Sequence, residues 1–176
     1  MSDGQRLLLG FARREVLELP VIANSLSRIC RFAGNLPEHY SVAQHSLFVA
    51  DHAPPELELA ALLHDAHEVI LGDIPKPISL YAGSILGDIK AEIDQAIAEK
   101  YGLDPKDFHR AEIKEVDSFA AQVEYMTYKP LNTVLDDCVD YGIRVCALPV
   151  DEVRRQFEER VTEAMASRLQ RAEGQT

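Results

Sequence analysis

The stretch LLHDAHEVILGDIPKP, residues 62–77, places two histidines and three acids directly after a continuous apolar run. That run predicts a deeply packed helix. His64 and Glu68 would share one face of it and Asp65 would lie one step round, so we expect the three side chains to converge on a single point. Burying an imidazole beside a carboxylate without a partner costs on the order of several kcal/mol, and a metal ion is one solution. A hydrogen-bonded or salt-bridged core pair is the ordinary alternative.

The wider region from Cys30 to Lys76 is poor in cations and rich in imidazole and carboxylate. Before Lys76 it contains one arginine, Arg31, together with five of the six histidines and seven acids. Solvated helices usually mix both signs of charge, and neutral imidazole and carboxylate are ligands that first-row divalent metals accept. The composition of this region therefore favours a metal site.

Apolar periodicity predicts helices through most of the chain. We expect them over residues 21–33, 41–53, 56–71, 84–101, 107–128 and 150–172, with an irregular loop at 72–77 that holds two prolines. Ser41 followed by Gln44 matches a capping box. Residues 141–145 could form a turn and a short strand, and residues 1–20 a hairpin. The pattern predicts a single all-α domain over residues 1–176.

His45 lies on the apolar stripe of the 41–53 helix. A lone histidine there is commonly a satisfied core residue, but consecutive helices with a short link pack antiparallel, which brings His45 near His64. Asp117, at the edge of the apolar stripe of the 107–128 helix, is the best candidate for a fourth ligand. The acids that compete with it are Glu92, Asp94 and Glu124. We expect His67 to support the metal ligands or to face solvent.

Composition narrows the class of partner. The net charge of −11 and the pI near 4.9 argue against a nucleic-acid polymer, although a local basic pocket for one phosphate stays possible. Three cysteines without CxxC spacing indicate reduced thiols in a cytoplasmic protein. No signal peptide or membrane-spanning run is visible, and neither are a GxSxG elbow, a phosphate-binding glycine loop or an HExxH motif.

The pattern resembles the HD-domain superfamily of metal-dependent phosphohydrolases, whose signature is a histidine, a His-Asp pair one helix later and a distant aspartate. The matching segments are Arg31-Phe32, YSVAQHS (40–46), LLHDAHEVILGDIPKP (62–77) and KEVDSFAAQVEY (114–125), within residues 24–128. They are most similar to the 5′-deoxynucleotidase branch. The resemblance implies a compact helical bundle around a buried metal site, and a homodimer. Phe32 replaces the tryptophan of the best-studied relatives, and Lys76 replaces a small hydroxyl residue.

The resemblance also implies roles for individual residues. The ligands of one divalent ion, which could be Mn, Co, Mg, Fe or Zn, would be His45, His64, Asp65 and Asp117. Glu68 would deprotonate or orient the attacking water, and Asp73 would protonate the departing 5′-oxygen or read the 3′ side of the sugar. Substrate would be bound by Arg31 at the phosphate, by Phe32 at a sugar or base, and by Lys76 beside the phosphate.

The leading hypothesis is a phosphomonoesterase that converts deoxynucleoside 5′-monophosphates to nucleoside and phosphate. One alternative is an HD phosphohydrolase acting on a triphosphate, a cyclic nucleotide or an alarmone; an alarmone hydrolase would show HDxxED, and Val69 follows Glu68 here. The other is a catalytically silent metal- or nucleotide-binding module, which would have no need of the proton-transfer pair Glu68 and Asp73.

Overall fold

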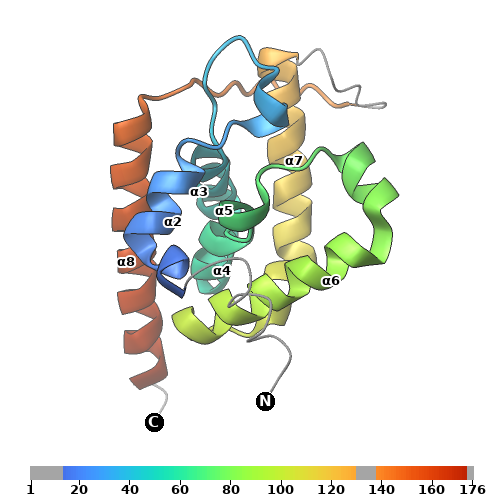
Figure 1. The fold of residues 1–176 in the computed structure, drawn as a ribbon. Helices are drawn as coiled ribbons and strands as arrows, with labels where there is room; N and C mark the ends of the chain where they lie inside the picture. The colour runs from blue at the N-terminus through green and yellow to red at the C-terminus, as the bar shows by residue number, and fades with distance from the viewer. Residues whose placement is uncertain (1–13, 130–137, 174–176) are drawn as a thin grey trace.

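The computed structural model describes residues 14–129 and 138–173. Within these ranges all regular structure is helical, and one antiparallel bridge between Cys30 and Ser41 is the only strand-like pairing. The helices pack into one compact body, as Figure 1 shows. The predicted all-α class is confirmed.

Eleven helical segments follow one another in the described residues. They are η1 (Arg14–Leu17), α2 (Leu19–Leu26), η2 (Arg31–Gly34), α3 (Val42–His52), η3 (Pro55–Leu57), α4 (Glu58–Leu63), α5 (Glu68–Leu71), α6 (Lys76–Tyr101), η4 (Pro105–His109), α7 (Ala111–Tyr128) and α8 (Val150–Glu173). None of them is both long and apolar enough to cross a membrane.

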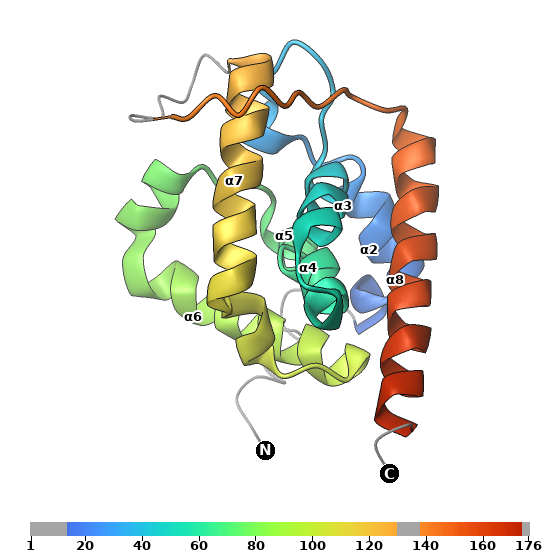
Figure 2. The same ribbon diagram turned by 180° about the vertical axis from the view of Figure 1, so that it is seen from behind.

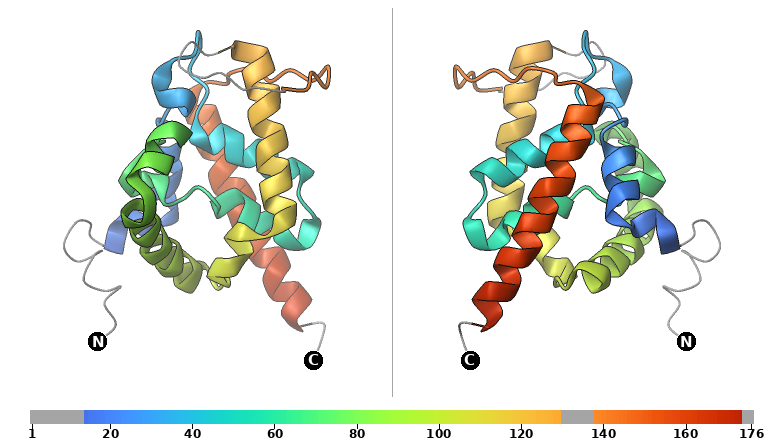
Figure 3. Two further views of the ribbon diagram at one scale, coloured as in Figure 1. Left: turned by 90° about the vertical axis from the view of Figure 1, so that its right-hand side faces the viewer. Right: turned by 90° about the vertical axis from the view of Figure 1, so that its left-hand side faces the viewer.

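Helices α3 and α4 form the centre of the molecule and pack on each other. Helix α7 flanks them on one side and α8 on the other (Figures 1 and 2), and α8 lies diagonally across one face (Figure 3). The apolar faces of these helices meet in one core. It includes Ile22, Leu26, Val42, Leu62, Ile97, Ile113, Phe157 and Val161. The core therefore fixes the positions of α3, which carries His45, of α7, which carries Asp117, and of the end of α4, which His64 and Asp65 follow.

The predicted helix over residues 21–33 is shorter than expected. Helix α2 ends at Leu26, and the chain then turns into η2, where Phe32 and Ala33 adopt left-handed backbone angles with φ of 56° and 52°. The bridge to the next segment imposes this path, because Val42 N–H donates to the Ile29 carbonyl at 3.0 Å. A left-handed non-glycine residue costs about 1–2 kcal/mol. Such strain is typical of functional segments.

The predicted helix from 56 to 71 is interrupted at its centre. Helix α4 ends at Leu63 and α5 begins at Glu68, and a tight turn joins them. Its hydrogen bonds run from Ala66 N–H to the Leu63 carbonyl and from Glu68 N–H to the Asp65 carbonyl, both at 3.0 Å. Because bonds of this three-residue type align side chains three apart, Asp65 and Glu68 are brought above one another.

Helix α6 begins earlier than predicted. It includes Lys76 and Pro77, since proline is tolerated in the first turn of a helix, so only residues 72–75 of the predicted loop are irregular. Gly83, with φ of 58° and ψ of −138°, kinks the helix, and Gly102 in a left-handed conformation ends it. The predicted 107–128 helix divides into η4 and α7, whereas α8 agrees with the predicted 150–172 within one residue.

Of the turn and short strand considered for residues 141–145, the structure has a bend at Gly142 and no strand. Residues 138–149 form an irregular segment that runs from the side of α7 to the start of α8, as Figure 2 shows. Side chains hold this segment: Gln44 binds the Cys146 carbonyl at 2.5 Å and the Leu148 N–H at 3.2 Å. The Ser41 side chain caps the start of α3 as predicted. The Gln44 side chain does not complete a capping box, because it is hydrogen-bonded to the backbone of Cys146 and Leu148. Of the proposed N-terminal hairpin, residues 14–20 are helical or bent, and residues 1–13 lie outside the described chain.

Candidate metal centre

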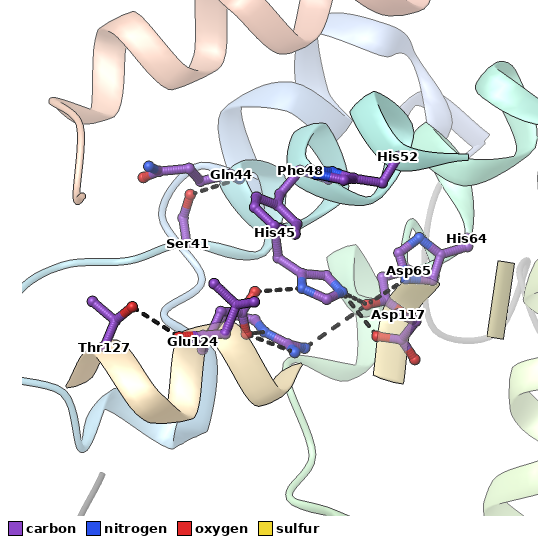
Figure 4. Close-up of polar contacts among 12 residues, drawn as sticks. Ser41, Gln44, His45, Phe48, His52, His64, Asp65, Asp117, Glu124 and Thr127 are labelled. Atoms are coloured by element: carbon purple, nitrogen blue, oxygen red, sulfur yellow. Dashed lines mark hydrogen bonds and ion pairs between the residues drawn. The ribbon is translucent and has the colours of Figure 1, made fainter. Parts of the chain in front are cut away.

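His45 is fully buried on α3, and both of its ring nitrogens face acids. Nδ1 donates to Glu124 Oε1 at 2.6 Å. Nε2 lies 3.1 Å from Asp117 Oδ1 and 3.7 Å from Asp65 Oδ2, without the geometry of a hydrogen bond to either. Figure 4 shows the ring between Glu124 on one side and the two aspartates on the other. Nε2 of the imidazole therefore faces a group of carboxylates.

His64 reaches the same point from the turn after α4. Its Nδ1 donates to the Ala61 carbonyl at 2.7 Å, which leaves Nε2 as the acceptor nitrogen. That nitrogen is buried, has no hydrogen-bond partner and lies 3.2 Å from Asp65 Oδ2. The centres of the His45 and His64 rings are 5.4 Å apart. The predicted approach of these two histidines is confirmed.

Three of the four predicted ligands form one group that could hold a metal ion. One ligand atom each of His45, His64 and Asp117 lies within 4.8 Å of the others. The fourth, Asp65, approaches both imidazoles. The Asp117 side chain is 44 % exposed, so the centre opens to solvent on the side of α7.

The charged groups also control protonation at this centre. Burial and the neighbouring Arg31 lower the pKa of His45, but Glu124 and Asp117 outweigh them and raise it to about 10. Burial would raise the pKa of Asp65, yet the adjacent histidines, His64 foremost, hold it well below its ordinary value. The acids around His45 therefore stabilise the protonated form of its imidazole.

Glu124 has a different role from the one considered for it as a competing ligand. It is fully buried on α7 and meets Nδ1 of His45, the ring nitrogen that faces away from the candidate ligand group of His45, His64 and Asp117. Its Oε2 accepts bonds from Arg31 Nε and Nη2 at 3.2 and 3.1 Å. Two donors of the predicted phosphate clamp are thus engaged by Glu124, while Arg31 Nη1 lies 3.9 Å from Asp65 Oδ2.

Glu68 does not join His64 as expected; the tight turn groups it with Asp65 and His67, whose ligand atoms also lie within 4.8 Å of one another. The Glu68 side chain is buried, and its Oε2 has no hydrogen-bond partner. Burial, followed by the Asp65 and Asp73 charges, raises the pKa of Glu68 to about 9. The expected convergence of His64, Asp65 and Glu68 on one point is wrong in this respect.

His67 is buried, which excludes the solvent-facing position that the sequence allowed. Its Nδ1 lies 3.2 Å from Oδ1 of Asp94, a residue of α6 that is only 1 % exposed. On the far side, Nε2 of His109 lies 3.5 Å from Asp94 Oδ2. A signal for Asp94 existed, because it shares the apolar stripe of α6 with Ile97 and Ala98.

A cavity of about 190 Å³ lies beside the centre, between the 64–72 segment and α6. Its walls are formed by Asp65, His67, Glu68, Leu71, Gly72, Ile74, Ser79, Gly83, Leu86, Gly87 and Lys90. The cation in this lining is Lys90, which the sequence did not indicate, whereas Lys76 is exposed on the first turn of α6. The mixed lining suits a polar ligand.

The remaining predicted residues lie at the strained η2 segment. Asp73 Oδ2 accepts a hydrogen bond from Ala33 N–H at 3.3 Å, which ties the loop after α5 to η2. The Arg31 guanidinium carbon lies 5.6 Å from the centre of the Phe32 ring. The structure thus brings Arg31, Phe32 and Asp73 to one side of the centre.

Two curated proteins are similar to this chain, while no family model matches it. The uncharacterized protein YfdR of Escherichia coli (strain K12) is 48 % identical over 87 residues, which cover 48 % of this chain and 47 % of that protein. The uncharacterized protein RCAP_rcc00048 of Rhodobacter capsulatus is 34 % identical over 136 residues, which cover 70 % of this chain and 69 % of that protein. The match thus spans about half the length of the first relative and over two thirds of the second.

Proposed function

Since the chain belongs to the same family as the uncharacterized Rhodobacter capsulatus protein, we propose its function from the site: a metal-dependent phosphohydrolase of the HD type. Its proposed reaction is hydrolysis of deoxynucleoside 5′-monophosphates to nucleoside and phosphate. One observation carries the proposal. The Nε2 atoms of His45 and His64 are buried, have no hydrogen-bond partner and lie within 3.7 Å of an aspartate.

The donor set fits a divalent ion. Its proposed ligands are His45, His64, Asp65 and Asp117, a mixture of imidazole and carboxylate that suits Mn, Co, Mg, Fe or Zn. In each histidine the Nδ1–H group donates a hydrogen bond to an oxygen, which is the arrangement typical of metal-binding histidines. When bound, the ion supplies Lewis acidity that acidifies water and offsets phosphoryl charge.

Glu68 is the proposed proton acceptor for the attacking water. Its unpartnered Oε2 belongs to the same group of close ligand atoms as Asp65, which places an oxygen that can accept a proton beside the proposed ion. We assign protonation of the departing 5′-oxygen, or recognition of the 3′ side of the sugar, to Asp73. The Ala33 N–H bond fixes that carboxylate near η2.

Arg31 is the proposed phosphate clamp, held in place by its two bonds to Glu124. Phe32, beside it, would pack on the sugar or base, and the exposed Lys76 would approach the phosphate as it binds. We also propose a cytoplasmic location, which the three free cysteines support, and a homodimer. Light scattering on the purified chain tests the dimer.

The test is phosphate release from a panel of deoxy- and ribonucleoside 5′-monophosphates after metal stripping and return of Mg, Mn or Co. We expect release from the deoxy set that depends on metal and is lost in His64→Ala and Asp65→Ala. His52→Ala, which changes an exposed histidine of α3, is the matched control and should keep the activity. Absence of release from every monophosphate would refute the proposal and direct the assay to triphosphates, cyclic nucleotides and alarmones.

A further inference from the structure

We propose that a second divalent cation binds between Asp65, His67 and Glu68, in the cavity against α6. One ligand atom of each residue lies within 4.8 Å of the others. All three side chains line the same cavity of about 190 Å³. Distances of this size allow three donors to surround one ion at ordinary ligand lengths of about 2.0–2.6 Å.

The burial of these donors points to a ligand. His67 is 5 % exposed and Glu68 is 8 % exposed, and Glu68 Oε2 has no hydrogen-bond partner. A buried carboxylate oxygen without a donor carries a desolvation cost that a cation would offset. Lys90 also lines the cavity, but no ion pair joins it to Glu68 within the described residues.

His67, like the two histidines of the first centre, has its Nδ1 close to an oxygen of a neighbouring group. Its Nδ1 lies 3.2 Å from Asp94 Oδ1 without the geometry of a hydrogen bond, whereas Nδ1 of His45 is hydrogen-bonded to Glu124 and Nδ1 of His64 to the Ala61 carbonyl. Metal-binding histidines characteristically direct one nitrogen to a carboxylate or carbonyl and the other to the ion. Because Nδ1 lies near Asp94, the proposal assigns Nε2 of His67 to the ion.

Asp65 joins the two sites. Its Oδ2 approaches the histidines of the first centre, while the same carboxylate belongs to the second group. A carboxylate has two oxygens and can bridge two ions, an arrangement known from hydrolases with paired metals. The second site rests on the proposed phosphohydrolase centre only through Asp65. Ligation by one oxygen of Glu68 leaves its other oxygen to orient the attacking water.

Mn²⁺ titration of the metal-stripped full chain, without nucleotide, tests this inference. Calorimetry and the free-Mn²⁺ paramagnetic resonance signal should give two ions per chain, and the bound signal should show spin coupling when the second ion enters. His67→Phe keeps an aromatic ring but removes the nitrogen donors, so it should bind one ion. His52→Phe, the matched change at an exposed histidine, should still bind two. A single ion in the wild type, or two coupled ions in His67→Phe, would overturn the proposal.

A second variant separates ligation from folding. Asp94→Asn should weaken the second ion about 10–100-fold and leave the first unchanged, because Asp94 only orients His67. Equal loss of both ions, or of neither, contradicts the assignment. The Mn²⁺ titration contains no nucleotide, so it is independent of the phosphate-release assay. Two coupled ions in the titration with no release in the assay would refute only the proposed reaction. Phosphate release by a protein that binds a single ion would refute only the second site.

Discussion

Replacement of Glu124 by glutamine is the sharpest test of how the centre is built. Glu124 is fully buried and accepts three hydrogen bonds, from His45 Nδ1 at 2.6 Å and from Arg31 at 3.1 and 3.2 Å. Glutamine keeps the size of the side chain but removes its charge and replaces one acceptor oxygen by a donor. Either His45 or Arg31 then faces an NH₂ group.

The size of the effect follows from these contacts. Removal of one partner from a buried ion pair costs about 3–5 kcal/mol, and the retained shape of glutamine favours the lower end. For a chain of this length, about 3 kcal/mol lowers the melting temperature by roughly 6–12 °C. Loss of an outer-shell partner weakens metal binding about 10–100-fold, so Glu124→Gln should bind Co²⁺ or Mn²⁺ that much more weakly.

Calorimetric titration of metal-stripped protein measures the affinity, and thermal unfolding measures the stability. Glu115→Gln, at an exposed position of the same helix, is the control and should change neither quantity. Circular dichroism confirms that both variants retain their helices. If folded Glu124→Gln binds metal within about threefold of the wild type, Glu124 does not orient a ligand and the reasoning is refuted.

Three further outcomes are expected. In the metal-free protein the pKa of His45 is raised to about 10, so binding of an ion must release a proton below that pH. Affinity for Mn²⁺ should then rise by up to about tenfold per pH unit between pH 6 and 8, and calorimetry in two buffers of different ionisation enthalpy counts the proton. The pKa of Glu68 is raised to about 9, so its ionisation destabilises the fold as pH rises from its ordinary value toward 9. In denaturant unfolding of metal-stripped protein, the free energy of unfolding of Glu68→Gln relative to that of the wild type should rise by up to about 1.4 kcal/mol per pH unit in this window. An equal difference between the two proteins at pH 5 and at pH 8 would contradict this expectation. Ala33→Gly should raise the free energy of unfolding by about 1 kcal/mol, because glycine adopts the left-handed angles of Ala33 without strain; a loss of stability in the same measurement would show that Ala33 is not strained.

The helices that the sequence predicted well are those fixed by local periodicity. The predicted bounds of α8 agree to one residue, because its buried Val153, Phe157 and Val161 recur at helical spacing. The sequence did not predict the break at residues 64–67, because His64 and His67 keep helical backbone angles. What changes is the spacing of the backbone hydrogen bonds, which join residues three apart here and four apart in a regular α-helix. Such a change leaves no mark on composition or periodicity.

The left-handed turn at Phe32 and Ala33 could not be predicted for another reason. Neither residue favours positive φ, so local preference argues against the observed conformation. The conformation is set by pairing with a segment about ten residues later, where Arg31 N–H donates to the Tyr40 carbonyl at 2.9 Å. Tertiary contacts of this kind override local propensity, and they are invisible without the partner segment.

The candidate site shows the same division between what spacing predicts and what packing decides. Asp117 and Glu124 are seven residues apart, about two turns of α7, so spacing alone puts them on one face toward α3. Spacing could not say which acid meets which nitrogen of His45. The pairing depends on the position of α3 along the axis of α7, which places Nε2 beside Asp117 and Nδ1 beside Glu124. A shift of α7 by one helical turn would move both acids away from these nitrogens. The distinction between a ligand and its support is therefore a property of helix packing, and residue type alone does not reveal it.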